Sequence, residues 1–380
     1  MTQLRITVRN TSEIGGTFLT PTYFGFHDGS FNLFDAGSAA SPGLESLAED
    51  GAAATLATER VAADADSQGI VVAGAGGPIA TQEITSAIID VDGASNGFVN
   101  YAAMILPSND AFIGNDESLK VFSASGRFLG EQTVVIEGSD VYDAGTEVNT
   151  ELDAAFINQT GPNTGVDENG VVRLHPGFNG SEGNPLGDEG TGEGDQIILG
   201  GTNAFGEFID PVEADFTREG AQIAEIHINT VVERTGTDGR DFIFGRRDDD
   251  LIDAGGGNDI ISGGRGWDVI DGGEGNDWIA GGRGADVIAG GAGFDFIRGG
   301  RGDDQFLFSS GDDYDVIKDF NQRGDDQLVL NVDGIESFDD VLSNAHDTRF
   351  GVKLDLGDGD GILLRRVDLD ELSESDFLFV

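Results

Sequence analysis

The chain has 380 residues, of which 70 are Asp or Glu and 21 are Lys or Arg, so its formal net charge is −49 at pH 7. This charge excludes binding to a nucleic-acid backbone as the main activity, because such binding needs a basic surface. The absence of cysteine excludes a disulfide framework and thiol catalysis, and no apolar run reaches the roughly 18 residues that a membrane helix needs.

Residues 1–234 form the first region that composition distinguishes, and short stretches of alternating apolar and polar residues recur along it. Gly, Asn and Asp turns separate these stretches. The N-terminal decapeptide MTQLRITVRN reads as a strand, with Leu4, Ile6 and Val8 alternating, rather than as a signal peptide. Only residues 43–59 favour a helix, and weakly. The pattern therefore predicts an antiparallel β-sandwich.

Three acidic residues lie in two of the predicted loops of this region. Asp110 follows an apolar strand, while Asp143 and Glu147 bracket Gly145, which permits a tight bend. Carboxylate oxygens are ligands that Ca²⁺ prefers. These residues favour a cation site at one end of the sandwich; ordinary solvated loop acids in a very acidic chain are the alternative.

Three segments of the same region resemble the spondin N-terminal domain in its bacterial form, namely FHDGSFNLFDAGSAAS (26–41), LPSNDAFIGND (106–116) and SDVYDAGTEVNT (139–150). The resemblance covers roughly residues 3–232. It implies a C2-like sandwich that carries one Ca²⁺ on loops at one end, with Asp110, Asp143 and Glu147 as carboxylate ligands. Glu147 departs from the family pattern, in which animal members tend to carry Asp, but Glu also ligates Ca²⁺.

A nine-residue repeat follows, in eight copies over residues 236–307. Each copy has an acid at its sixth place: Asp241, Asp250, Asp259, Asp268, Asp277, Asp286, Asp295 and Asp304. The eighth place is always Ile or, in the last copy, Phe. The glycine-rich half of each copy permits the positive φ angles of a tight turn, and the other half predicts a short strand with one side chain pointing inward. About two copies then make one coil of a parallel β-solenoid.

The eight sixth-place aspartates would stack in such a solenoid. Aspartates eighteen residues apart would lie at the interstrand spacing of roughly 4.8 Å. Two unit charges roughly 5 Å apart repel by about 3 kcal/mol at an effective dielectric constant of 20. Such a stack needs cations between its members, and a hard dication such as Ca²⁺, which binds carboxylate and carbonyl oxygens, fits. The repeats therefore predict Ca²⁺ bound at these eight aspartates.

The repeat resembles the RTX nonapeptide family, whose unit G-G-x-G-x-D-x-U-x forms a calcium-loaded β-roll. The resemblance implies that the carbonyls at the second and fourth places and the sixth-place carboxylate bind Ca²⁺, as at Gly273, Gly275 and Asp277. The third to eighth copies match the unit well. The first copy lacks the second-place glycine and the second copy lacks the glycines at both places, which leaves open whether the first sites hold ions.

Residues 308–380 predict further short strands and a short helix at 338–344. This region resembles the cap and secretion signal that follow RTX repeats in exported proteins, and a cap would cover the open apolar end of the solenoid. We therefore expect three regions: a spondin-like sandwich over 1–234, a calcium-binding RTX β-roll over 235–307, and a cap with a type I secretion signal over 308–380. The expected location is extracellular, after export by the bacterial type I secretion machinery.

No catalytic motif accounts for the four histidines. The sequence has no H-E-x-x-H and no G-x-S-x-G, which argues against a metalloprotease and a lipase. His175 alone has a distinctive local context, and a loop histidine bonded to backbone is the simpler interpretation. We predict a protein without catalytic residues, whose spondin-like head binds extracellular glycans or matrix. The alternatives are an extracellular hydrolase of polysaccharide or peptide, and a structural component of a surface or matrix.

Overall fold

The structure, a computed structural model, describes residues 1–12, 16–75, 77–106, 111–145, 170–175, 221–321, 325–357 and 359–380. These residues form two compact units, Met1–Ile228 and Asn229–Val380. Strands dominate both units. The predicted all-β class is confirmed, with antiparallel sheets in the first unit and a parallel β-roll with a C-terminal β cap in the second.

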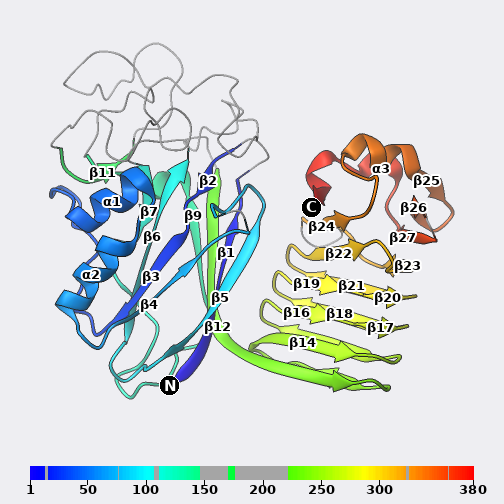
Figure 1. The fold of residues 1–380 in the computed structure, drawn as a ribbon, viewed down its shortest axis with the longest axis horizontal. Helices are drawn as coiled ribbons and strands as arrows, with labels where there is room; N and C mark the ends of the chain where they lie inside the picture. The colour runs from blue at the N-terminus through cyan, green and yellow to red at the C-terminus, as the bar shows by residue number, and fades with distance from the viewer. Residues whose placement is uncertain are drawn as a thin grey trace, which may run out of the picture. The chain divides into compact units, whose positions relative to one another are not determined.

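The first unit is built from two antiparallel sheets (Figure 1). One sheet contains β1 (Thr2–Asn10), β5 (Ile84–Val91), β9 (Gln132–Glu137) and the first part of β12 (Gln222–Thr237). The other contains β2 (Phe18–Leu19), β3 (Thr22–His27), β4 (Gln68–Val72), β6 (Phe98–Leu106), β7 (Ala111–Gly114), β8 (Leu119–Lys120), β10 (Val141–Asp143) and β11 (Arg173–Leu174). The strand expected at the N-terminus is β1, which pairs with β5.

A common core lies between these two sheets. Leu4, Ile6 and Val8 of β1 are fully buried, and they belong to one cluster with Phe24 and Phe26 of β3. Side chains two residues apart in a strand point to the same face, so the alternation seen in the sequence places these residues inside the sandwich.

Two helices cover the outer face of the second sheet, α1 (Pro42–Asp50) and α2 (Ala54–Ala63) (Figure 1). The sequence indicated one weak helix over residues 43–59. Gly51 ends α1 with a φ of 67°, a left-handed conformation that favours glycine, and this residue separates the two helices. Leu44 of α1 and Leu56 of α2 pack in one cluster with Phe112 of β7, so both helices are fixed by apolar contacts.

The second unit contains two sheets that run along the repeats (Figure 1). The first continues from β12 through β14 (Asp249–Gly255), β16 (Val269–Asp271), β19 (Val287–Ala289), β22 (Gln305–Ser309), β24 (Gln327–Asn331) and β28 (Phe377–Phe379). The second contains β13 (Phe242–Phe244), β15 (Ile260–Arg265), β18 (Trp278–Arg283), β21 (Phe296–Arg301), β23 (Tyr314–Ile317), β27 (Asp360–Arg365), β26 (Gly351–Gly357) and β25 (Ala345–Thr348). A small third sheet pairs β17 (Glu274–Gly275) with β20 (Ala292–Gly293).

Strands of the repeats pair in parallel with a register of eighteen residues. Ile252 pairs with Ile270 and Ile270 with Ile288 in one sheet, while Ile261 pairs with Ile279 in the other. One coil therefore contains two copies of the repeat, as predicted. The eighth-place side chains point into the coil, and from the second copy to the eighth they are at most 3% exposed.

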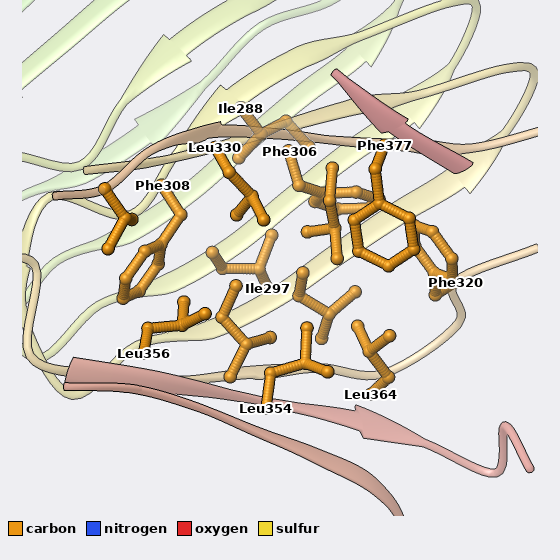
Figure 2. Close-up of a cluster of buried hydrophobic side chains, with 14 of the residues drawn as sticks. Ile288, Ile297, Phe306, Phe308, Phe320, Leu330, Leu354, Leu356, Leu364 and Phe377 are labelled. Carbon is orange, nitrogen blue, oxygen red and sulfur yellow. The ribbon is translucent and has the colours of Figure 1, made fainter. Parts of the chain in front are cut away.

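The C-terminal residues close the apolar end of the β-roll. Figure 2 shows Phe320 and Phe377 near Phe306, the last eighth-place residue of the repeats, and Leu354 in the same apolar cluster. The short helix that the sequence predicted is α3 (Phe338–Asn344), capped by the Ser337 side chain. Within the described part of the chain, none of the helices is long and apolar enough to cross a membrane.

Candidate metal centre

The sixth-place aspartates form two rows along the β-roll, which we call the aspartate ladder. One row contains Asp241, Asp259, Asp277 and Asp295, and the other contains Asp250, Asp268, Asp286 and Asp304. From Asp250 onward these side chains are at most 1% exposed. The register of eighteen residues therefore stacks buried carboxyl groups above one another in each of the two rows.

From Asp259 to Asp304, each carboxylate of the ladder uses one oxygen to link two coils. The backbone N–H of Asp259 donates to Oδ1 of Asp277 at 2.7 Å, and the N–H of Asp277 donates to Oδ1 of Asp295 at 2.7 Å. The second row repeats the contact, with the N–H of Asp268 donating to Oδ1 of Asp286 at 2.9 Å. These bonds orient the carboxylates and leave Oδ2 for another partner.

The Oδ2 atoms of the central ladder are buried without a donor. Those of Asp259, Asp277, Asp286 and Asp295 have no hydrogen-bond partner. A buried ionised oxygen without a partner is costly. Bound Ca²⁺ would supply the missing positive charge, and the carboxylate is a ligand type that it prefers.

Carbonyl oxygens share the space beside these carboxylates. A Cβ built on Gly272, the first residue of its copy, would lie 2.7 Å from Oδ2 of Asp277 and 2.5 Å from the carbonyl oxygen of Gly290. Glycine is required there because its missing side chain leaves room for the two oxygens. A carboxylate and a carbonyl brought together without a donor suit a hard dication, so the residues fit the calcium ion that the repeats imply.

The glycines at the second and fourth places adopt the conformation that the repeat requires. Gly273 has a φ of 86° and Gly275 a φ of 136°, both in the left-handed region. A Cβ on Gly275 would overlap the carbonyl oxygen of Gly257 in the preceding coil. The fourth place of these copies therefore admits no other residue without moving the backbone.

We expect the substitution Gly275→Ala to lower the stability of the calcium-loaded β-roll by on the order of 3 kcal/mol. This corresponds to a fall of roughly 5–10 °C in the melting midpoint of the second unit. The control is Gly239→Ala at the same place of the first copy, where the new Cβ would meet only the Thr237 hydroxyl, at 3.9 Å. Thermal melts followed by circular dichroism measure both variants, and equal midpoints would contradict the steric account.

In the ladder, burial raises the pKa of the carboxyls of Asp277, Asp286, Asp295 and Asp304. Desolvation raises the pKa of Asp277 to about 6, of Asp295 to about 7 and of Asp304 to about 8. Desolvation also raises the pKa of Asp286, and the charges of Asp268 and Asp304 add to the effect. Without a cation, these folded carboxyls therefore lose their protons at a higher pH than an ordinary aspartate, between about pH 6 and pH 8.

These shifts give the metal-free β-roll a defined pH dependence. A carboxyl whose pKa is higher in the folded than in the unfolded chain, as here, stabilises the fold at pH values below its unfolded pKa of 3.8, and this stability is lost as the pH rises through the folded pKa. In chelator we therefore expect the melting midpoint of the second unit to fall between pH 5 and pH 8.5. Melts over this range measure it, and a midpoint that rises with pH would contradict the assignment.

In the first two copies, groups of the protein itself donate hydrogen bonds to the sixth-place carboxylates. Oδ1 of Asp250 accepts from Nε of Arg234 at 2.6 Å, and its Oδ2 accepts from the N–H of Arg246 at 3.1 Å. Oδ2 of Asp241 accepts from the N–H and the hydroxyl of Thr237, each at 2.7 Å. These copies are the ones that lack the expected glycines, and an arginine supplies the positive charge beside Asp250.

The ladder continues beyond the last copy, which the sequence analysis missed. The N–H of Asp295 donates to Oδ1 of Asp315 at 3.0 Å, and the N–H of Asp304 donates to Oδ1 of Asp326 at 3.0 Å. Desolvation raises the pKa of Asp315 to about 9. The signal was present, because Asp315-Val316-Ile317 repeats the sixth to eighth places, but the spacing has grown from eighteen to twenty residues.

Of the three residues predicted to bind calcium in the first unit, the structure describes only Asp143. Asp110 and Glu147 lie outside the described residues. Asp143 is fully buried, with Oδ1 accepting from the N–H of Gly145 at 2.6 Å and Oδ2 accepting from Nε of Arg173 at 3.1 Å. Gly145 has a φ of 66°, in keeping with the bend that the sequence indicated. Calcium ligation by these three residues stays a prediction.

His175 lies near this aspartate and is nearly buried, with 8% exposure. Desolvation lowers its pKa to about 4, although the charge of Asp143 opposes the shift. The ring is therefore neutral at pH 7. Among the described residues, His, Cys, Asp and Glu side chains do not gather into a group of three or more that could hold a metal.

Comparisons with known proteins agree with both halves of the chain. Residues 19–164 match the Spondin_N family, and residues 235–270, 262–297 and 280–315 match the RTX calcium-binding nonapeptide repeat. The RTX family binds Ca²⁺. No curated protein matches the chain.

One solved structure shows a limited likeness. It is the crystal structure of the extracellular lipase LipA from Serratia marcescens, with 19% sequence identity and a TM-score of 0.23. The alignment covers 40% of this chain and 38% of the lipase chain. A likeness of this size carries no conclusion about activity.

Proposed function

We propose that this chain, which joins a region of the Spondin_N type to RTX calcium-binding repeats, is a secreted binding protein. Its β-roll folds when it binds extracellular calcium. The repeats support a calcium-binding protein of the secreted type. The observation that carries the proposal is the set of buried Oδ2 atoms in the central ladder that have no donor. They make the folded state of the second unit depend on a cation or on protons.

Calcium-dependent folding suits export through a narrow channel. Where calcium is scarce, the ladder repels itself and the repeats stay unfolded, as a type I secretion channel requires. Extracellular calcium sites bind with dissociation constants of about 10⁻⁴–10⁻³ M, so the ladder would fill only after export. Because binding favours the folded state alone, its free energy becomes folding free energy.

We propose a non-catalytic binding role in adhesion to glycans or matrix, with a contact surface on the β-roll. Among the described residues, the exposed aromatic side chains all belong to the second unit. Trp278 is 55% exposed and lies tilted against Phe296, and Nζ of Lys318 lies 3.8 Å from the centroid of the Trp278 ring. These residues line a hollow of about 520 Å³ together with Arg298, Arg365 and Asp319, whose Oδ2 accepts from Nε of Arg298 at 3.0 Å.

The chemistry of this hollow fits an acidic glycan. The flat aromatic faces offer apolar surface to a sugar ring, and Lys318 offers charge-assisted hydrogen bonds to its carboxylates. In a chain of net charge −49, a gathering of cations around exposed aromatic rings is a local exception.

A binding screen tests this role. The full chain is applied to immobilised glycans and matrix proteins in millimolar calcium and in chelator. We expect calcium-dependent binding to an acidic glycan that Trp278→Ala weakens by about tenfold or more, as for a central aromatic contact. The control is Phe350→Ala, an exposed aromatic residue of the cap that does not line the hollow. Equal losses in both variants, or no ligand in calcium, would contradict the proposal.

A further inference from the structure

Arg60 of α2 is a buried cation that forms no ion pair with the described residues. It is 5% exposed, and its one side-chain hydrogen bond runs from Nε to the Tyr23 hydroxyl at 2.6 Å. Its Nη1 atom is buried without a hydrogen-bond partner, and none of the ion pairs among the described residues involves it. Arginine is rarely buried without a partner, because removing its charge from water is costly.

Two glycines on neighbouring strands make room for this side chain. Gly25 of β3 and Gly69 of β4 face each other in the sheet register. A Cβ on Gly25 would lie 2.6 Å from Cδ of Arg60, and a Cβ on Gly69 would lie 2.9 Å from its Nη2. The missing side chains of these two glycines leave room for the guanidinium against the sheet. Its Nη2 atom lies next to the exposed Gly69.

A hollow of about 390 Å³ opens beside the guanidinium, between α2 and the strands β3 and β4. Tyr23, Arg60 and Gly69 supply its polar part. Its other walls are small or apolar: Pro21, Ala53, Ala54, Ala57, Ile70 and Val71. This size lies within the range of small-molecule sites, about 300–1,000 Å³, and the lining combines one cation with apolar walls.

The hydrogen-bond donors of the hollow indicate which charged group a ligand would carry. Arginine presents its N–H groups in a planar fork that matches a carboxylate. The Tyr23 oxygen accepts from Arg60, which leaves the hydroxyl proton to donate to an anion. Among the described residues of the lining, Arg60 alone is charged, which suits a monoanion better than a phosphate dianion.

We propose that this hollow binds a carboxylate with a compact apolar body. Nη2 of Arg60 and the Tyr23 hydroxyl donate to the carboxylate, and the alanine, isoleucine and valine side chains contact the apolar body. The carboxylate belongs either to a small free acid or to the C-terminus of a peptide with an apolar last residue, since both present the same group.

Calorimetric titration of the full chain in calcium tests the proposal. The probes are butanoate, 3-methylbutanoate, benzoate and a tripeptide ending in valine, each beside its uncharged amide. We expect saturable binding of at least one carboxylate and of none of the amides, and the acids and the peptide together show which source fits. Failure of all four carboxylates, or equal binding of the amides, would overturn it.

Variants separate a binding role of Arg60 from a structural one. We expect Arg60→Met to abolish carboxylate binding while keeping or raising the melting midpoint of the unliganded first unit, because it removes an unpaired buried charge. Ala57→Leu fills the hollow without touching the charge and should weaken binding at least tenfold, whereas Ala62→Leu, exposed on the same helix, should not. If Arg60→Met unfolds the unit, or Ala57→Leu leaves binding unchanged, the hollow is not the site.

Discussion

Removal of calcium at pH 8 is expected to unfold the second unit and leave the first unit folded. In the ladder, desolvation has already raised the pKa of Asp304 to about 8 and that of Asp315 to about 9, so ionising these buried rows together opposes folding. The net charge of −49 adds repulsion across the whole chain. Cations between the carboxylates would offset the first effect and reduce the second.

The two tryptophans of the chain report this transition. Both Trp267 and Trp278 lie in the repeats, and Trp267 is 6% exposed. We expect chelation to shift tryptophan emission to longer wavelength as Trp267 enters water, with a matching loss of β-structure in circular dichroism. Magnesium should not restore the signal at the same concentration, because it demands octahedral geometry and keeps its water ligands. Unchanged emission in chelator at pH 8 would contradict the expectation.

The second large effect is expected for Asp277→Asn in the centre of the ladder. Asn keeps the size of the side chain and one acceptor oxygen, but it removes the charge that faces the space shared with the Gly290 carbonyl. Asp277 also accepts the N–H of Asp259, so the change reaches the neighbouring coil. We expect the calcium concentration at half-folding to rise on the order of tenfold or more, as measured by titration of tryptophan emission.

Glu274→Gln is the matched control for this variant. Glu274 lies in the same nine-residue copy, but its side chain is exposed. Both variants remove one negative charge, so a general effect of net charge would move both titrations equally. The account requires a large shift for Asp277→Asn and a small one for Glu274→Gln, and the reverse order would contradict it.

The register of the repeats made the β-roll predictable from the sequence. A fixed period of nine residues places Ile252, Ile270 and Ile288 at one position of successive coils, and they pair in parallel as expected. The two aspartates that extend the ladder were harder to predict, because Asp315 and Asp326 follow spacings of twenty and twenty-two residues. The constant period of nine residues ends with the last regular copy, so it does not predict these two aspartates.

Partners that are distant in sequence were not predictable. The Arg234 side chain pairs with Asp250 because β12 lies next to β14, and nothing in the repeat pattern encodes that contact. Asp143 was expected as a calcium ligand, yet Arg173 lies against it from β11, thirty residues later. The burial of Arg60 is likewise set by glycines on two strands rather than by its own helix. Local pattern determines the repeats, whereas these contacts depend on tertiary packing.

A crystal structure of the calcium-loaded chain, with anomalous scattering to identify the ions, tests the central claim most directly. The account predicts calcium peaks between the coils, within about 2.3–2.6 Å of the carboxylate oxygens of Asp259, Asp277, Asp286 and Asp295. Anomalous maps without peaks there, or with those oxygens bonded to protein donors in a folded β-roll, would contradict it.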